Sequence, residues 1–175
     1  MARITIIRLL IALATIHGLV IHQMDVKTAL LNGDLDEEVY MKQPEGLLIK
    51  NQEHKVCRLI KSLYGLKQGP KQWHQKFDEV ILADGFKINQ ADKCVYSKFN
   101  NSGQGVIICL YVDDMLIFGT SQKEVDATKE FLATKFSMKD LGEVDVILGI
   151  KIKREVGGIT LTQSHYIEKV VKRFN

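Results

Sequence analysis

The stretch VIICLYVDDMLIFG, residues 106–119, places two adjacent aspartates in the middle of a long apolar run. Buried carboxylates without a partner are costly, so the charges of Asp113 and Asp114 need compensation. The apolar segments on either side predict two strands of a hairpin, with the aspartates at its reversal. A solvent-exposed turn is the alternative, because aspartate is common in turns. The reversal contains no Gly, Asn or Pro, which favours a functional pair.

A third carboxylate, Asp25, ends another predicted strand, LVIHQMDV (residues 19–26). Neighbouring side chains on a strand point apart, but at a turn both can approach one site. We therefore expect one aspartate of the pair to bind a metal and the other to support it. Oxygen ligands of this kind suit Mg²⁺, and two such ions would stabilise an in-line phosphoryl transfer.

The remaining pattern predicts an α+β fold with an antiparallel sheet covered on one face. Helices are expected over residues 3–17, 70–84 and 121–136, and a final basic helix from residue 164. Pro70 suits a first helical position, and Ser121 with Glu124 forms a capping box. Further strands are expected over residues 38–43, 55–63, 94–99, 105–112, 115–119, 145–155 and 159–163.

The first helix needs care, because residues 9–21 resemble the apolar core of a signal peptide. His17 interrupts this core, no small-x-small cleavage site follows, and the run is short for a membrane span. We therefore expect an amphipathic helix. Its apolar face is predicted to consist of Ile6, Leu9, Leu10, Leu13 and Ile16.

The net charge of +3 over 175 residues does not by itself require a nucleic-acid partner. Two segments are more basic: residues 50–76, where Glu53 is the only acid, and residues 151–175. Together they could follow a phosphate backbone, or they could be a solvated lysine-rich surface. Three cysteines without CxxC spacing indicate reduced thiols in an intracellular protein.

Five motifs, in order along the chain, closely resemble the reverse transcriptase of copia-type retrotransposons. They are QMDVKTALLNG (23–33), VYMKQPEG (39–46), SLYGLKQGPKQW (62–73), LYVDDMLIFG (110–119) and KDLGEVDVILGIKI (139–152). The resemblance implies the palm of a right-hand polymerase with a ferredoxin-like βαββαβ core, partial fingers and the start of a thumb. It implies a palm with part of the fingers over residues 1–140, a primer-grip-like hairpin over 141–163 and a thumb helix from 164.

The resemblance also implies site residues, which carry over position by position. Asp25, Asp113 and Asp114 would be the catalytic carboxylates, with two Mg²⁺ or Mn²⁺ ions held by Asp25, Asp113 and the Val26 carbonyl. The nucleotide would be bound by Lys27, Thr28, Ala29, Leu30, Gly65, Lys67 and Gln68. Lys139 would be the general acid for pyrophosphate, although Lys135 is nearby. The primer grip would include Leu148, Gly149 and Ile150.

The chain departs from the family pattern at two of these motifs. Leu30 stands where the family usually has an aromatic steric gate against the ribose 2′-hydroxyl, which implies weaker discrimination against ribonucleotides. Gly69 replaces a more usual alanine, and we expect it to loosen the start of the helix. The fingers segment expected upstream, most of the thumb and any RNase H domain are missing from this sequence.

The function implied is RNA- and DNA-directed DNA synthesis, in which a primer 3′-hydroxyl attacks the α-phosphate of a dNTP. The expected partners are an RNA or DNA template, a DNA primer, dNTPs and the rest of a retrotransposon polyprotein, including integrase. The expected location is intracellular, in a cytoplasmic particle or the nucleus, without membrane association. A catalytically silent remnant that only folds or binds nucleic acid is one alternative. A two-metal nuclease that uses the same carboxylates is another.

Overall fold

The computed structural model describes residues 2–174, and these fall into two compact units. Residues 1–27 and 85–175 belong to the first unit, and residues 28–84 to the second. Four α helices and antiparallel sheets make up the described residues, so the mixed architecture agrees with the sequence prediction. The predicted palm region begins at residue 1 and the predicted thumb helix extends to residue 175, and these two residues lie outside the described residues.

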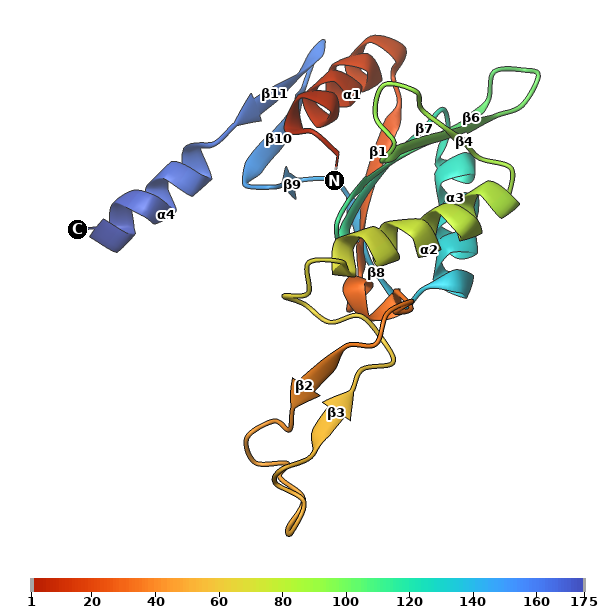
Figure 1. Cartoon of the computed structure of the whole chain (residues 1–175). Helices are drawn as coiled ribbons and strands as arrows, with labels where there is room; N and C mark the ends of the chain where they lie inside the picture. Colours follow the sequence, from red (N-terminus) through yellow and green to blue (C-terminus); the bar gives the residue numbers. More distant parts are fainter. Residues whose placement is uncertain (1, 175) are drawn as a thin grey trace. The chain divides into compact units, whose positions relative to one another are not determined.

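A six-stranded antiparallel sheet is the centre of the first unit (Figure 1). Its strand order is β4-β5-β6-β7-β1-β8. The bounds are β1 Val20–Val26, β4 Lys87–Ile88, β5 Val95–Phe99, β6 Gly105–Tyr111, β7 Asp114–Gly119 and β8 Met138–Glu143. The two apolar segments of residues 106–119 thus form the β6–β7 hairpin, as predicted. β1 pairs with β7, which brings the third aspartate to the same part of the sheet.

One face of this sheet is covered by α3, Gln122–Lys135. A side chain at Gly119 would stand only 2.4 Å from Cγ2 of Val125, so the helix packs directly on β7. The predicted cap is present, because the Ser121 hydroxyl accepts a hydrogen bond from the Glu124 N–H. Apolar side chains of the helix and of the sheet are fully buried, among them Leu132 of α3 and Ile117 of β7. Their burial from water is the main source of stability here.

The sheet contains two strands that the sequence pattern did not reveal, the two-residue β4 and the longer β8. The sequence of β8, MKDLGE, carries charges and a glycine, and most of its side chains are exposed. β8 lies at the edge of the sheet and pairs with β1 through a register shift between Gln23 and Met24. Because an edge strand with exposed side chains has no alternation of apolar residues, periodicity does not identify it.

The N-terminal helix, α1, spans Ile4–His17 and ends at Gly18, which adopts the left-handed conformation (φ 63°). The helix was predicted, but its buried face was predicted wrongly. Leu9 and Ile16 are 53% and 74% exposed. The buried residues are Ile7, Leu10, Ile11 and Ala14, of which only Leu10 belongs to the predicted face. α1 is apolar on more than one side, so helical spacing alone fits two alternative stripes and only packing selects one.

A three-stranded sheet follows, in the order β11-β10-β9. Its strands are β9 Val146–Ile147, β10 Ile150–Glu155 and β11 Gly158–Thr162. The single strand predicted over 145–155 is therefore wrong, because Leu148 and Gly149 turn the chain with φ 51° and 75°. The last helix, α4, spans Ser164–Phe174 (Figure 1), and none of these residues is buried.

The second unit consists of a short 3-10 turn, a two-stranded ribbon and a helix. Their bounds are η1 Ala29–Asn32, β2 Tyr40–Lys42, β3 Val56–Arg58 and α2 Gly69–Ala83. The two strands are shorter than the predicted ranges 38–43 and 55–63, although Asp34 and Lys61 form a further isolated bridge. In α2, the rings of Trp73 and Phe77 lie 5.6 Å apart and are almost completely buried, so both are core residues.

The start of α2 is packed closely against the segment before it. A side chain at Gly69 would stand 2.7 Å from Oγ of Ser62 and 3.2 Å from the Leu63 carbonyl oxygen. Gly69 therefore permits the start of α2 to approach the preceding segment closely. The sequence predicted only that Gly69 loosens the helix start and did not predict this close packing. The Ser62 hydroxyl is buried and has no hydrogen-bond partner within residues 2–174.

We expect the Ser62→Ala variant to raise the free energy of unfolding by about 1 kcal/mol. The substitution removes a buried hydroxyl that pays the cost of leaving water without gaining a hydrogen bond. Urea unfolding monitored by circular dichroism measures the change. Ser137, which is exposed, provides the control, and Ser137→Ala should stay within about 0.5 kcal/mol of the unsubstituted chain. A loss of stability in Ser62→Ala would contradict this account of the hydroxyl.

Two further sequence expectations concern the thiols and the membrane. Cys57, Cys94 and Cys109 are free thiols, and burial raises the pKa of Cys109 to about 12. The Cys109 thiol is thus kept in its neutral form at physiological pH. Across residues 2–174, no helix combines the length and the apolar character that crossing a bilayer requires.

Candidate functional site

Two of the three predicted carboxylates lie directly opposite each other in the sheet. Asp25 in β1 pairs with Asp114, the first residue of β7. The line of cross-strand partners extends to the two neighbouring strands, because Tyr111 in β6 pairs with Asp114 and Lys139 in β8 pairs with Asp25. Cross-strand partners share a face of a sheet. The side chains of Tyr111, Asp114, Asp25 and Lys139 therefore form one row, which we call the carboxylate row.

The carboxylate row lies on the face opposite α3. His22 and Ile117 are cross-strand partners, and the Nδ1 atom of His22 lies 3.0 Å from Nζ of Lys129 in α3. Side chains alternate along β1, so His22 faces the helix whereas Asp25 faces away from it. The helix α3 therefore packs on one face of the sheet, and the carboxylate row lies on the opposite face.

Asp113 occupies a different position from Asp114. It follows Val112 in the two-residue turn between β6 and β7, whereas Asp114 already belongs to the strand. The Val26 N–H donates to the Asp113 carbonyl oxygen (2.8 Å), which fixes this turn against the end of β1. Val112 has φ 55°, a conformation that a β-branched residue rarely adopts. The tertiary structure thus holds a strained turn in place beside Asp25.

Gln23 is a site residue that the sequence interpretation missed. Its side-chain Nε2 donates to Oδ1 of Asp114 at 2.9 Å, and only 8% of the residue is exposed. Gln23 precedes Asp25 by two positions, so the two side chains lie on the same face of β1. That spacing was a signal available in the sequence, since a polar residue at a buried strand position needs a partner.

Burial raises the pKa of the Asp114 carboxyl group. The hydrogen bond from Gln23 lowers this pKa, while the negative charges of Asp25 and Asp113 raise it again, and the net direction is upward. The three carboxylates are thus close enough for their charges to repel. A divalent cation would relieve that repulsion, and oxygen donors are the ligands that Mg²⁺ and Mn²⁺ prefer. The donor set therefore fits a hard cation.

The arrangement is not a closed protein cage. Within the part of the chain that the structure describes, no group of three or more His, Cys, Asp or Glu side chains could hold a metal ion. Mg²⁺ is commonly bound by one or two carboxylates, with waters and substrate phosphates completing its shell. Asp25 and Asp113 remain the predicted ligands, together with the Val26 carbonyl.

We expect Asp114→Asn to stabilise the chain at neutral pH in metal-free buffer. The native pKa of Asp114 lies above its ordinary value, so the native state loses stability as pH rises through the native pKa. Asparagine removes this penalty and can still accept the Gln23 hydrogen bond. Urea unfolding in EDTA, repeated from about pH 7 downward, should show an advantage that disappears near the ordinary carboxyl pKa of about 3.9. The exposed Asp126 supplies the control, Asp126→Asn.

Two outcomes of this pH series would contradict the prediction for Asp114→Asn. If Asp114→Asn is less stable than the unsubstituted chain at neutral pH, burial and repulsion do not dominate at Asp114. An advantage that persists unchanged at low pH would also contradict the assignment, because both chains are neutral at this position there.

The predicted nucleotide-binding residues fall in both units. The Lys27 N–H donates to the Ser137 carbonyl oxygen at 2.9 Å, so this amide already has a partner. Thr28, at the start of the second unit, adopts φ 52° before η1. Ala29 and Leu30 are buried, with Leu30 only 5% exposed. The assignment of these four residues to the nucleotide stays a prediction.

The other predicted nucleotide-binding residues lie in the segment before α2. Gly65 adopts φ 92°, a left-handed conformation that favours glycine. Lys67 is exposed, and Gln68 is the N-cap residue of α2 without a side-chain capping bond. At this helix start the Gly69 N–H donates to the Leu66 carbonyl oxygen at 3.1 Å and the Lys71 N–H to that of Gln68 at 3.0 Å, while Pro70 has no N–H. The assignment of this helix start to a phosphate therefore stays a prediction.

The two candidate lysines for proton transfer are separated by the fold. Lys139 is exposed and lies beside Asp25 in the β1–β8 register. Lys135 lies in the last turn of α3, with Nζ 6.0 Å from the centre of the Phe131 ring. The register therefore favours Lys139. The residues predicted to belong to the primer grip are Leu148 and Gly149, which form the turn between β9 and β10, and Ile150, the first residue of β10; this role stays a prediction.

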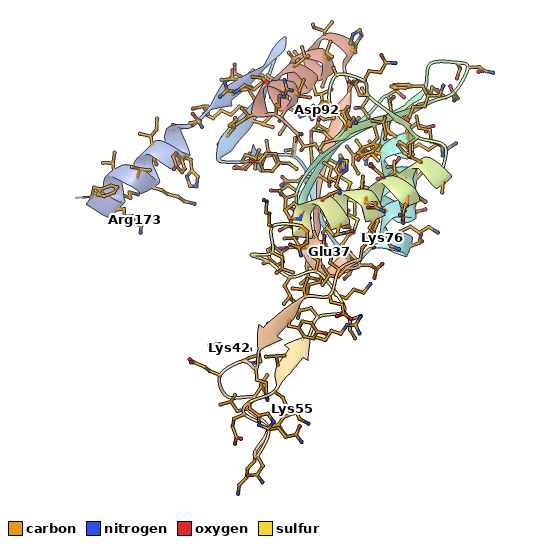
Figure 2. All side chains as sticks on the ribbon, viewed as in Figure 1. Glu37, Lys42, Lys55, Lys76, Asp92 and Arg173 are labelled. Atoms are coloured by element: carbon orange, nitrogen blue, oxygen red, sulfur yellow. The ribbon has the colours of Figure 1, made fainter. Side chains whose placement is uncertain are left out.

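The basic segment over residues 50–76 is partly neutralised by acids that precede it. Arg58 pairs with Glu38 at 3.2 Å, and Asp34 pairs with both Lys61 and Lys76. Counting charges within residues 50–76 omitted these acidic partners. Exposed lysines remain on the β2–β3 ribbon and its loop, including Lys42 and Lys55, which are labelled in Figure 2. In the C-terminal segment, Arg173 lies on α4 in the same view.

Comparisons with known proteins identify one protein family for this chain. The family model described as "Reverse transcriptase (RNA-dependent DNA polymerase)" matches residues 1–175. The retrovirus-related Pol polyprotein from transposon TNT 1-94 of Nicotiana tabacum is 46% identical over 175 residues, which are 99% of this chain and 13% of that protein. The corresponding polyprotein from transposon RE1 of Arabidopsis thaliana is 37% identical over 172 residues, 98% of this chain and 12% of that protein.

A shorter relative comes from yeast. The putative transposon Ty5-1 protein of Saccharomyces cerevisiae is 38% identical over 147 residues, which are 83% of this chain and 47% of that protein. The chain thus spans less than half the length of each of these relatives.

Proposed function

This chain belongs to the reverse transcriptase (RNA-dependent DNA polymerase) family, and we propose that it extends a DNA primer on an RNA or DNA template. The relatives from tobacco, Arabidopsis and yeast indicate a copia-type retrotransposon polyprotein as its context. The observation that most directly supports this activity is the pairing of Asp25 with Asp114 beside the Asp113 turn.

The topology supports assignment of the first unit to a polymerase palm. The strands β1, β6, β7 and β8 follow one another along the chain, with β2 to β5 and α2 between β1 and β6, and α3 between β7 and β8. In the sheet these four strands lie in the order β6-β7-β1-β8, while α2 belongs to the second unit. This sequence of elements fits a ferredoxin-like βαββαβ core. We assign the β9–β10–β11 hairpins to the primer grip and α4 to the start of the thumb.

We assign Asp25 and Asp113 to hold two Mg²⁺ or Mn²⁺ ions, with the Val26 carbonyl as a further ligand and Asp114 as the supporting carboxylate. Bound divalent ions supply electrostatic stabilisation of the attacking and leaving oxygens. The primer 3′-hydroxyl loses its proton to solvent, and its oxygen attacks the α-phosphate of the dNTP. A new phosphodiester bond forms as the phosphoanhydride bond between the α- and β-phosphates breaks and pyrophosphate leaves. Catalysis is then mainly positioning and electrostatics, because the protein forms no covalent intermediate.

The remaining roles follow from the same assignment. Lys139, which lies beside Asp25 in the sheet, protonates the departing pyrophosphate. Lys27, Thr28, Ala29, Leu30, Gly65, Lys67 and Gln68 bind the incoming nucleotide. The exposed lysines of the two basic segments contact template and primer phosphates. The partners are completed by the fingers, thumb, RNase H and integrase of the longer polyprotein, in a cytoplasmic particle or the nucleus.

Primer extension tests this proposal against its two rivals. The chain is incubated with a primed RNA template, Mg²⁺ and dNTPs, and product length is read on a denaturing gel. Extension supports the polymerase. A salt-dependent shift of primer–template without extension supports a remnant that only binds nucleic acid. Cleavage of the template in the absence of dNTPs supports a two-metal nuclease.

A further inference from the structure

We propose that Gln23 is a positioning residue for the carboxylate row, and that its side-chain amide fixes the orientation of Asp114 toward the cation site. The proposal rests on the proposed function, because the cation site is the one assigned to Asp25 and Asp113. It adds to that function a residue whose side chain is neither a metal ligand nor a proton carrier.

The hydrogen-bond geometry is specific to these two residues. Gln23 in β1 lies directly opposite Leu116 in β7, and Asp114 is two residues away on the same strand and the same face. Nε2 of Gln23 spans this diagonal and reaches Oδ1 of Asp114 at 2.9 Å. Diagonal neighbours in an antiparallel pair are within reach only of long side chains. A glutamine has the required length.

The surroundings leave the amide few alternatives. Gln23 is 8% exposed, and its partner in β8 is Gly142, which has no side chain. Leu116, its partner on the other side, is apolar and buried. A buried amide without a hydrogen-bond partner is costly, so the bond to Asp114 is strongly favoured. The bond therefore holds the Asp114 side chain in one orientation.

The chemistry of the amide suits a cation site better than a charged donor would. An N–H group binds one carboxylate oxygen and leaves the full negative charge of the side chain in place. A lysine or arginine at position 23 would instead neutralise that charge and compete with a metal ion. Groups around a metal site are commonly held by such bonds, and loss of one of these outer partners typically costs 10–100-fold in metal affinity or activity. Gln23 would be a partner of this kind through the supporting carboxylate Asp114.

The test replaces Gln23 by methionine, which has similar length but no donor. The chain offers a matched control, because Nε2 of Gln122 donates to Oδ1 of Asp126 at 2.8 Å on an exposed surface. Gln23→Met and Gln122→Met are compared in Mn²⁺ binding, measured by electron paramagnetic resonance, and in single-nucleotide primer extension. We expect Gln23→Met to weaken Mn²⁺ binding and to lower kcat by about 10-fold or more. The KM for dNTP should remain unchanged, and Gln122→Met should match the unsubstituted chain.

A second comparison separates positioning from general destabilisation. In an Asp114→Asn background, Gln23→Met should cause a much smaller additional loss, because the carboxylate that Gln23 orients is already absent. Circular dichroism establishes that each variant is folded. If Gln23→Met does not fold, Gln23→Glu takes its place, since glutamate keeps the length but repels Asp114.

Failure of this inference is distinct from failure of the proposed function. If the unsubstituted chain extends primers and Gln23→Met stays within twofold in Mn²⁺ affinity and kcat, the role of Gln23 is overturned and the polymerase stands. If neither the unsubstituted chain nor Asp113→Asn extends primers, polymerase activity of this chain is refuted. In that case the Mn²⁺ affinities of the unsubstituted chain and of Gln23→Met test the role of Gln23. Equal affinities, or no Mn²⁺ binding by either chain, would overturn that role.

Discussion

Asp113→Asn is expected to lower primer extension by about 10²–10³-fold while leaving the fold intact. Asp113 lies in the turn that the Val26 N–H bonds against the end of β1, and its carboxylate is one of the two assigned metal ligands. Asparagine has nearly the same shape but carries no negative charge. Loss of one preorganised electrostatic group in a catalytic site commonly costs this much in rate. Single-turnover incorporation of one dNTP on a primed RNA template measures the effect.

The control for this substitution is Asp126→Asn, which removes a carboxylate from the exposed surface of α3. It should leave the incorporation rate within twofold of the unsubstituted chain. Equal incorporation by Asp113→Asn and the unsubstituted chain would show that Asp113 has no catalytic role. Equal inactivity of both would refute catalysis by these 175 residues.

Gly105→Ala is expected to lower the free energy of unfolding by about 3 kcal/mol. The added Cβ would stand 2.0 Å from the Lys98 carbonyl oxygen and 2.7 Å from Cα of Phe99, both backbone atoms of the neighbouring strand β5. Neither can move without breaking the ladder that pairs Phe99 with Gly105. Gly105 is held on its other side as well, since its carbonyl accepts from the Thr120 N–H at 3.0 Å. Overpacking against fixed atoms is strongly destabilising.

Chemical denaturation in urea measures this loss, with Gly158→Ala as the control. Gly158 also begins a strand, but a Cβ there would have no atom within 4 Å and its φ is not in the left-handed region. The control should change stability by less than about 1 kcal/mol. If Gly105→Ala is as stable as the control, the β5–β6 register described above is incorrect at this position.

Several features of the fold were predictable because local signals determined them. Gly18 and Ser121 delimit helices through backbone conformation and side-chain capping, so α1 and α3 appear close to the expected residues. The β6–β7 hairpin follows from two apolar runs around one polar reversal. By contrast, β8 forms because its backbone hydrogen-bonds to the free edge of β1. The MKDLGE sequence shows no alternation, so periodicity does not predict this strand.

The candidate site was likewise partly predictable. Acidic residues at strand ends pointed to Asp25, Asp113 and Asp114, and the structure brings Asp25 opposite Asp114. The division of roles around them depended on pairing. Lys139 is distinguished from Lys135 by its register with Asp25, and Gln23 is identified by the diagonal reach to Asp114. Such relations join residues far apart in the chain, and no local pattern encodes them.

The sequence by itself determined the family, the α+β class and the choice of the three candidate carboxylates, because these depend on residue types in ordered motifs. The tertiary structure alone decided that Asp113 belongs to the turn and Asp114 to the strand. It also decided which face carries the carboxylate row, and that a buried glutamine holds one of its members. The physical reason is that orientation and charge compensation depend on strand register, which forms only when distant segments pair.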